Sequence, residues 1–235
     1  GRDFVQINEE KPIDPFINDL ATLLFERNHM KILDKDFLTL AWEISKSKHL
    51  QLKVGASYFQ KTQLSNASDF VLFGSKDRVY TSNAPFNNEI GETNFGQYTG
   101  VTFDIGLSMS PWQRYRISNG RKSAIDGSSP TVTFLYKMGI PEVLESDLDF
   151  IQLEAGIKHQ FDVGIRGRMQ LQILGGTFLG DASIPFPEFK HFPGNLTALA
   201  TTDPVKSYRL LDYYVNSTSS AYLEAHLHYQ FRKFL

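Results

Sequence analysis

Hydrophobic and polar residues alternate along most of the chain after residue 35, and this period of two indicates β-strands. The clearest stretch is residues 99–110, TGVTFDIGLSMS, in which every second residue is apolar without an error. The same alternation marks residues 50–60, 151–163 and 221–232, with weaker versions over residues 37–45, 131–138 and 168–179. The pattern predicts an all-β, antiparallel chain with about seven long strands. They exceed the ~5–6 residues typical of globular proteins and match the ~9–11 tilted residues that cross a bilayer.

One short helix is expected ahead of the strands. Asp14 suits the N-cap, Pro15 suits the first helical position, and apolar residues recur after them at helical spacing (Phe16, Ile17, Leu20, Leu23 and Leu24). We therefore divide the chain into an N-terminal segment with a short helix, residues 1–35, and a partial β-barrel domain, residues 36–235.

The connections between the predicted strands alternate in length. Short turns are expected at residues 45–48 and 163–168, and long loops at residues 64–96 and 183–217. Short turns at one end and long loops at the other are typical of outer-membrane β-barrels. The polar stretch 112–130 is an exception, since strand parity assigns it to the short-turn end although it is too long for a turn.

The alternation alone fits two classes of protein, because exchanging inside and outside leaves the pattern unchanged. A soluble sandwich or lipocalin-like barrel is the first, and a transmembrane barrel segment is the second. Strand length and the mixture of both charge signs on the polar face favour the membrane barrel. So do aromatic residues near strand ends, where interfacial girdles lie: Tyr98, Trp112, Tyr136, Phe161, Tyr229 and Phe231.

Composition excludes several classes of protein. The chain is 41% hydrophobic with a mean hydropathy of −0.27, a formal net charge of −2 and a pI near 6.3, which argues against a strongly basic nucleic-acid binder. It has no cysteine, so disulfides and thiolate sites are absent. No run reaches the ~18 apolar residues that a membrane-spanning helix needs.

Candidate chemistry is sparse. His226 and His228 lie two residues apart on a predicted strand and share a face with Glu224, which makes them weak candidates for metal ligands. No third and fourth ligand can be named, so no metal and no cofactor is expected. Glu154, Lys158 and Asp162 also share a face and are expected to compensate one another as lumen charges. No hydrolase or phosphate-loop motif is present, and we expect no enzymatic activity.

The stretch FKHFPGN, residues 189–195, lies in the longest part of the chain without a period. We interpret it as architecture: Phe189 and Phe192 anchor a long loop, and Pro193 and Gly194 turn it. The candidate loop-anchor and turn residues are Phe189, His191, Phe192, Pro193, Gly194 and Asn195.

Five stretches carry a resemblance to a known family: LLFERNHMKILDKDFLTLAWE, YTSNAPFNNEIG, SSPTVTFLYKMGI, SDLDFIQLEAGIKHQ and IPFPEFKHFPGN. The chain resembles a family of Bacteroidota outer-membrane proteins that is labelled as a domain of unknown function. Its members often have an N-terminal carboxypeptidase-regulatory-like domain. The resemblance implies a barrel distantly similar to BamA and TamA.

In that superfamily a proline-aromatic approach and a glycine-rich turn precede an Arg-Gly-aromatic tip that folds into the lumen. IPFPEFKHFPGN resembles the approach and the turn, but Leu-Thr-Ala-Leu follows Asn195, so the arginine contact is not carried over. Placing this loop between the eleventh and twelfth strands of a sixteen-stranded relative implies that the chain is an internal fragment of the barrel.

The expected function is that of a non-enzymatic bacterial outer-membrane β-barrel in envelope biogenesis, in protein insertion or translocation, or in transport. Outer-membrane lipid and other envelope proteins are the expected partners, and nucleic acid is not. The alternative is a soluble or periplasmic barrel that binds an apolar ligand. A hydrolase that uses the barrel as a platform is a third reading.

Overall fold

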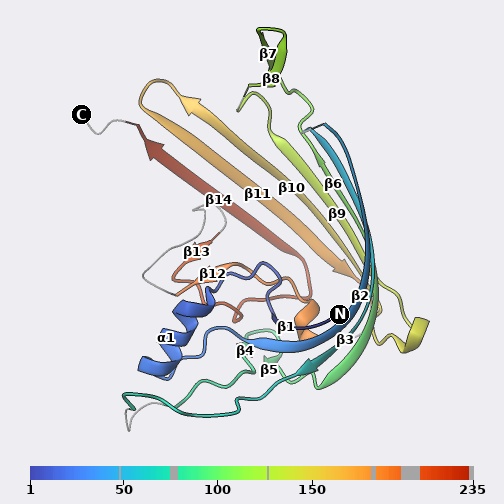
Figure 1. Cartoon of the computed structure of the whole chain (residues 1–235), viewed down its shortest axis with the longest axis vertical. Coiled ribbons are helices and arrows are strands. Elements are labelled where there is room, and N and C mark those ends of the chain that lie inside the picture. The colour runs from blue at the N-terminus through green and yellow to red at the C-terminus, as the bar shows by residue number, and fades with distance from the viewer. Residues whose placement is uncertain (48, 75–78, 126, 181–183, 197–206, 233–235) are drawn as a thin grey trace.

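The dominant feature of the chain is one antiparallel sheet in the order β1-β2-β3-β6-β9-β10-β11-β14. The computed structural model describes residues 1–47, 49–74, 79–125, 127–180, 184–196 and 207–232. Strand makes up 52% of the chain and helix 8%, which confirms the predicted β-rich fold. Within the described residues no ladder joins β1 to β14, so the sheet is an open curved wall, not a closed barrel (Figure 1).

Seven of the eight strands are long, in agreement with the alternation pattern. They are β2 (Ile32–Ser47), β3 (Leu50–Gln63), β6 (Gln97–Met109), β9 (Thr131–Gly139), β10 (Phe150–Val163), β11 (Gly167–Leu179) and β14 (Tyr222–Phe231). The eighth, β1 (Arg2–Gln6), pairs with the first residues of β2 and was not predicted, because five residues carry too little pattern. The N-terminal segment therefore also contributes to the sheet.

The predicted helix is confirmed as α1 (Pro15–Phe25). Asp14 is its N-cap, and its Oδ1 accepts hydrogen bonds from the backbone N–H groups of Phe16 at 2.9 Å and Ile17 at 3.4 Å. The helix ends at Glu26, which adopts the left-handed conformation. Among the described residues, no helix combines the length and the apolar character needed to cross a bilayer.

The polar stretch 112–130 forms a hairpin of its own, β7 (Tyr115–Ser118) and β8 (Arg121–Ala124). Asn119 and Gly120 form its tip with φ values of 51° and 72°, as a tight hairpin turn requires. The hairpin lies at the same end of the sheet as the β2–β3 and β10–β11 turns, which we call the short-turn end (Figure 1). The excess length over a simple turn is therefore an inserted pair of strands.

The opposite, long-loop end holds most of the remaining structure (Figure 1). Here lie α1 and three connections, which join β3 to β6, β9 to β10 and β11 to β14. These segments contain the short elements β4 (Phe86–Asn87), β5 (Gly91–Glu92), η1 (Val143–Glu145), η2 (Phe186–Glu188), β12 (Gly194–Asn195) and β13 (Tyr208–Arg209). Several of them lie within the curve of the sheet, on its concave side.

The register of the sheet gathers the apolar positions of all seven long strands onto one face. One row runs across the seven strands through Ile44, Leu52, Leu107, Phe134, Ala155, Gly175 and Leu223. The row one residue away runs through Glu43, Lys53, Gly106, Leu135, Glu154, Gly176 and Tyr222 on the other face. Because strand side chains alternate between faces, the loops that contact the second row lie on the polar, concave face.

The buried core does not lie against the apolar face of the sheet. One cluster consists of Ile7, Ile13, Leu33, Phe186, Phe189, Tyr213 and Tyr214, and a second of Phe59, Tyr98, Leu148 and Phe150. Both clusters form where loop segments pack against the long-loop end. The apolar face stays uncovered, with Leu40 71% exposed and Leu223 75% exposed.

Candidate functional site

The segment around η2 is held against the concave face of the sheet by charged residues. Pro185 and Pro187 flank the start of η2, where a missing N–H costs nothing. Phe186 and Phe189 are three residues apart and both enter the first core cluster. This places Glu188 and Lys190 against the sheet, and the two residues define what we call the Glu188 site and the Lys190 site.

The Glu188 site joins three neighbouring strands of the sheet to one carboxylate. Oε1 of Glu188 accepts hydrogen bonds from Lys61 Nζ of β3 at 2.5 Å and from Tyr98 Oη of β6 at 2.9 Å. Oε2 accepts from Lys137 Nζ of β9 at 2.9 Å. The side chain of Glu188 is 1% exposed and that of Lys61 is 3% exposed. A buried carboxylate with both oxygens occupied by donors is suited to cross-linking strands.

The electrostatics of this site keep Glu188 ionised. Burial alone would raise the pKa of Glu188, but the Lys137 and Lys61 ammonium groups outweigh burial and hold the pKa well below its ordinary value. The carboxylate is therefore a poor general acid at neutral pH, because it does not carry a proton to donate.

The Lys190 site has the opposite charge arrangement. Lys190 Nζ lies 3.0 Å from Glu154 Oε2 of β10 and 3.1 Å from Glu224 Oε1 of β14. Tyr222 Oη also donates to Glu154 Oε2 at 2.8 Å. Burial would lower the pKa of Lys190, but the two carboxylates outweigh it and raise the pKa. Together the two sites fasten one short segment to five strands of the sheet.

His191 directly follows Lys190 in the chain and is buried without charge. Its Nδ1 and the Ser217 hydroxyl are 2.8 Å apart, and its ring meets Phe186 and Tyr214 edge-on at 5.0 and 5.6 Å between centroids. Burial, followed by the charge of Lys61, lowers the pKa of His191 to about 3. The imidazole is therefore neutral at physiological pH.

The remaining loop-anchor and turn candidates continue the same path on the concave side. Phe189 is in the first core cluster, and Phe192 is half-buried and meets Tyr208 and Tyr222 edge-on. The Gly194 N–H donates to the Phe192 carbonyl at 2.8 Å, which makes a tight turn at Pro193.

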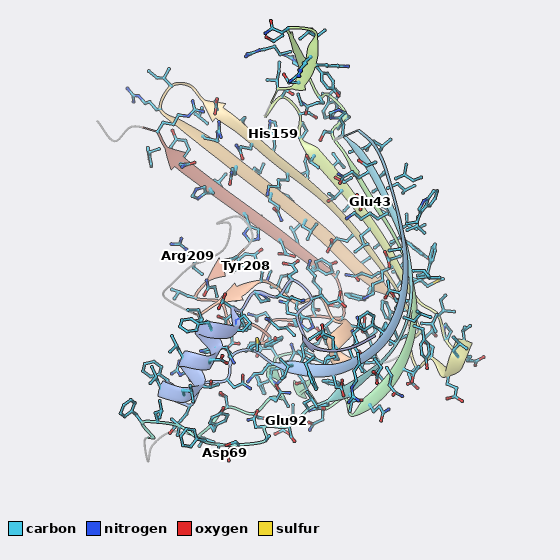
Figure 2. The ribbon with its side chains drawn as sticks, in the orientation of Figure 1. Glu43, Asp69, Glu92, His159, Tyr208 and Arg209 are labelled. Carbon is cyan, nitrogen blue, oxygen red and sulfur yellow. The ribbon has the colours of Figure 1, made fainter. Side chains whose placement is uncertain are left out.

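Gly194 and Asn195 form β12, which pairs in parallel with Tyr208 and Arg209 of β13. Figure 2 shows both β13 residues within the hollow of the sheet. A Cβ at Gly194 would lie 2.6 Å from the Leu211 carbonyl oxygen, so glycine permits this close approach. Residues 197–206, where the family's Arg-Gly tip was sought, lie outside the described residues.

The two histidines that were weak metal candidates lie on the concave face of β14. His226 Nε2 is 3.7 Å from Glu224 Oε2, and its ring lies 4.2 Å from that of Tyr208. Across the part of the chain that the structure describes, no group of three or more His, Asp or Glu side chains is placed to hold a metal ion. His226 therefore lies between the Glu224 carboxylate of its own strand and the Tyr208 ring of the loop.

The structure corrects two expectations, the placement of Tyr98 in an aromatic girdle and the pairing of the lumen charges. Tyr98 was expected in an interfacial girdle, but it is 5% exposed and donates to Glu188, because its position is in phase with the polar residues Thr102 and Asp104 of β6. The lumen charges were expected to compensate within one strand. Glu154 pairs with the loop residue Lys190, and Asp162 pairs with Arg168 and Arg232.

Sequence reasoning missed Glu188, Lys61 and Lys137 as site residues. Glu188 was visible as the only acidic residue in IPFPEFKHFPGN, and Lys61 and Lys137 were visible as lysines on otherwise regular strands. An isolated acid among aromatics in a loop, together with bases on the polar face, is the signal that could have suggested them.

We expect the stability of the folded chain to fall as pH decreases from about 6.5, because the unfolded state then binds a proton that buried His191 does not. His191 contributes at most about 1.4 kcal/mol per pH unit to the slope of the unfolding free energy against pH, until its folded pKa is reached. Guanidinium unfolding in detergent at several pH values, with and without His191→Gln, measures it.

The difference in unfolding free energy between wild type and His191→Gln should grow between pH 6.5 and 4.5. The depressed pKa of Glu188 affects stability only at lower pH, so it does not contribute in this range. The pKa of His29 is also lowered by burial, so His29→Gln serves as the parallel control that shows how much of the pH dependence comes from this second histidine. Equal slopes in wild type and His191→Gln would contradict the assignment.

Comparisons with known proteins identify a family for the chain and no curated relative. No curated protein matches the chain. A family model matches residues 1–235, the whole chain, and its description is the C-terminal domain of a family of unknown function, DUF5686. The chain with this curved sheet and ion-paired loop therefore belongs to the DUF5686 family, as its C-terminal domain.

Proposed function

We propose that this domain forms part of the lipid-facing wall of a bacterial outer-membrane β-barrel. One observation carries the proposal: the face of the sheet that is apolar across seven strands is the uncovered one, while the loops pack on the polar concave face. A soluble barrel would place its apolar face inside. The arrangement here has the inside-out polarity that lipid requires.

Exposure and strand length support this polarity. Large apolar residues on the convex face remain uncovered on both flanks of the sheet, among them Leu38 at 66%, Trp42 at 64% and Leu227 at 67%. Monomeric soluble proteins rarely leave apolar patches larger than a few hundred Å² in water. β2 has 16 residues and β10 has 14, enough to cross the ~30 Å hydrocarbon layer at a tilt.

The concave face then lines the lumen, and the Glu188 and Lys190 sites keep one loop fixed inside it. A cavity of about 360 Å³ remains beside that loop, and its walls include Lys35, Lys61, Asp104 and Lys137. These charges disfavour the alternative of a purely apolar ligand. We assign the domain a non-enzymatic role in envelope biogenesis or transport, with outer-membrane lipid as its primary partner and other envelope proteins as further ones.

Neighbouring residues of a central strand provide the direct test. Phe134 of β9 is on the apolar face and Thr133 is on the polar face, so each is replaced by cysteine in the cysteine-free domain and spin-labelled in proteoliposomes. We expect the label at 134 to collide with oxygen and to be shielded from a water-soluble nickel chelate. The label at 133 should not show this lipid signature. A label at 134 that is open to the nickel chelate would exclude the lipid-facing wall.

A further inference from the structure

The β7–β8 hairpin at the short-turn end carries a concentrated positive charge. Between residues 112 and 125 the sequence has four basic residues and no acidic one, and the next acidic residue is Asp126. The four are Arg114, Arg116, Arg121 and Lys122, and all are exposed. In the part of the chain that the structure describes, none of them forms an ion pair with a carboxylate. Their charge is available to an external partner.

Apolar side chains accompany this charge. Trp112 is 67% exposed and Ile117 is 73% exposed, and neither belongs to one of the two buried clusters. Lys122 Nζ lies 3.9 Å from the centre of the Tyr115 ring, which helps to hold the two hairpin strands in register. Exposed tryptophan and aliphatic groups beside arginine and lysine are the composition of segments that bind at a membrane surface.

The position of the hairpin matches that composition. It emerges where β6 ends at Met109 and β9 begins at Thr131, which is also where the apolar face of the sheet ends. Its four-residue strands extend roughly 13 Å at the usual rise per residue. If the apolar face lies in the hydrocarbon layer, the hairpin begins at the level of the lipid headgroups.

Charge is distributed unequally between the two ends of the sheet. Arg166 is exposed in the β10–β11 turn and adds to the positive charge of the hairpin end. At the long-loop end the exposed groups include many carboxylates, and Figure 2 shows Asp69 and Glu92 there. The short-turn end is therefore the one that attracts an anionic surface.

We propose that the β7–β8 hairpin docks on anionic phospholipid headgroups of the leaflet at the short-turn end. The arginines and Lys122 contact the phosphates, and Trp112 and Ile117 enter the interface. This inference rests on the proposed lipid-facing wall, since that wall places the hairpin at the headgroup level. Docking of the hairpin gives the domain a binding element for anionic phospholipids and fixes the orientation of the sheet relative to that leaflet.

The test uses an environment-sensitive dye on the hairpin tip of the protein in proteoliposomes. Ser118→Cys carries the dye, and the bilayers are either phosphatidylcholine alone or phosphatidylcholine mixed with anionic phosphatidylglycerol. We expect a blue-shifted emission and protection from aqueous quencher in the anionic bilayer, and reversal by high salt. Each basic residue contributes about fivefold to the docked-to-free ratio. Arg114→Gln, Arg116→Gln, Arg121→Gln and Lys122→Gln combined should lower the ratio by about 600-fold.

Two controls separate the possible failures. Arg114→Lys, Arg116→Lys and Arg121→Lys combined keep the charge and should retain docking, whereas loss of docking would overturn the charge argument. The same dye on Phe134→Cys reports the wall. Lipid contact at 134 with identical emission at 118 in both bilayers overturns the hairpin proposal alone, and water contact at 134 overturns the wall. Protection at 118 that depends on an acidic envelope protein and not on lipid charge also counts against docking on phospholipid.

Discussion

Glu188→Gln is expected to destabilise the folded domain by about 3–5 kcal/mol, because it leaves buried Lys61 and half-buried Lys137 without their shared counter-ion. Lys61 and Lys137 both bond to this carboxylate, at 2.5 and 2.9 Å. Glutamine keeps the shape of the side chain, removes the negative charge and replaces one acceptor oxygen by an NH₂ donor. Guanidinium unfolding of the detergent-solubilised protein, followed by tryptophan fluorescence, measures the change.

The matched control breaks an ion pair on exposed side chains of the same sheet. Glu43 and Lys53 lie 3.4 Å apart with side chains 49% and 62% exposed. Glu43→Gln should cost at most about 1 kcal/mol, since exposed pairs contribute little. Equal effects of the two substitutions would show that Glu188 does not hold the sheet.

A triple variant separates the loss of charge balance from the loss of the carboxylate. Glu188→Gln combined with Lys61→Met and Lys137→Met removes the unpaired charges together with their partner. Buried ionic groups replaced by apolar ones of similar volume are often neutral or stabilising. The triple variant should therefore be more stable than Glu188→Gln alone, and a further loss would contradict the ion-pair explanation.

The sheet was predictable because its signal is local. Alternation over residues 99–110 requires only neighbouring residues, and the same holds for the capping pattern at Asp14 and Pro15 that defined α1. The hairpin of β7 and β8 was also marked locally, by Asn119-Gly120, but the polar sequence around this turn conceals strand alternation. β1 has only five residues and depends on its pairing with β2.

The candidate site was less predictable because its contacts are distant in sequence. Lys61 and Glu188 are separated by 127 positions, and Tyr98 and Glu188 by 90. Extending the alternation of residues 50–60 and 99–110 by one position would have placed Lys61 and Tyr98 on the polar face and removed Tyr98 from the girdle. Which face is concave is decided by where the loops pack, and no strand pattern contains that information.

Leu40→Arg is expected to destabilise the domain in a lipid bilayer by about 2–4 kcal/mol, the cost of a cation near the midplane on the lipid side of a barrel. Leu40 is at the middle of β2, Ile32–Ser47, and its side chain is 71% exposed. If that exposure were to water, the same substitution would change stability by no more than about 0.5 kcal/mol. The two environments thus give results that differ severalfold for one residue.

The neighbouring residue supplies the control for this comparison. Thr39 faces the concave side, where its hydroxyl lies 3.0 Å from that of Ser57 and the cavity has room beside Asp104. Thr39→Arg keeps the added charge in a polar lumen and should cost less than about 1 kcal/mol, as surface substitutions do. Unfolding of both variants in the same lipid vesicles compares the two faces. If Leu40→Arg costs no more than Thr39→Arg, the apolar face does not contact lipid, because only a hydrocarbon environment penalises the arginine on one side of the strand and not on the other.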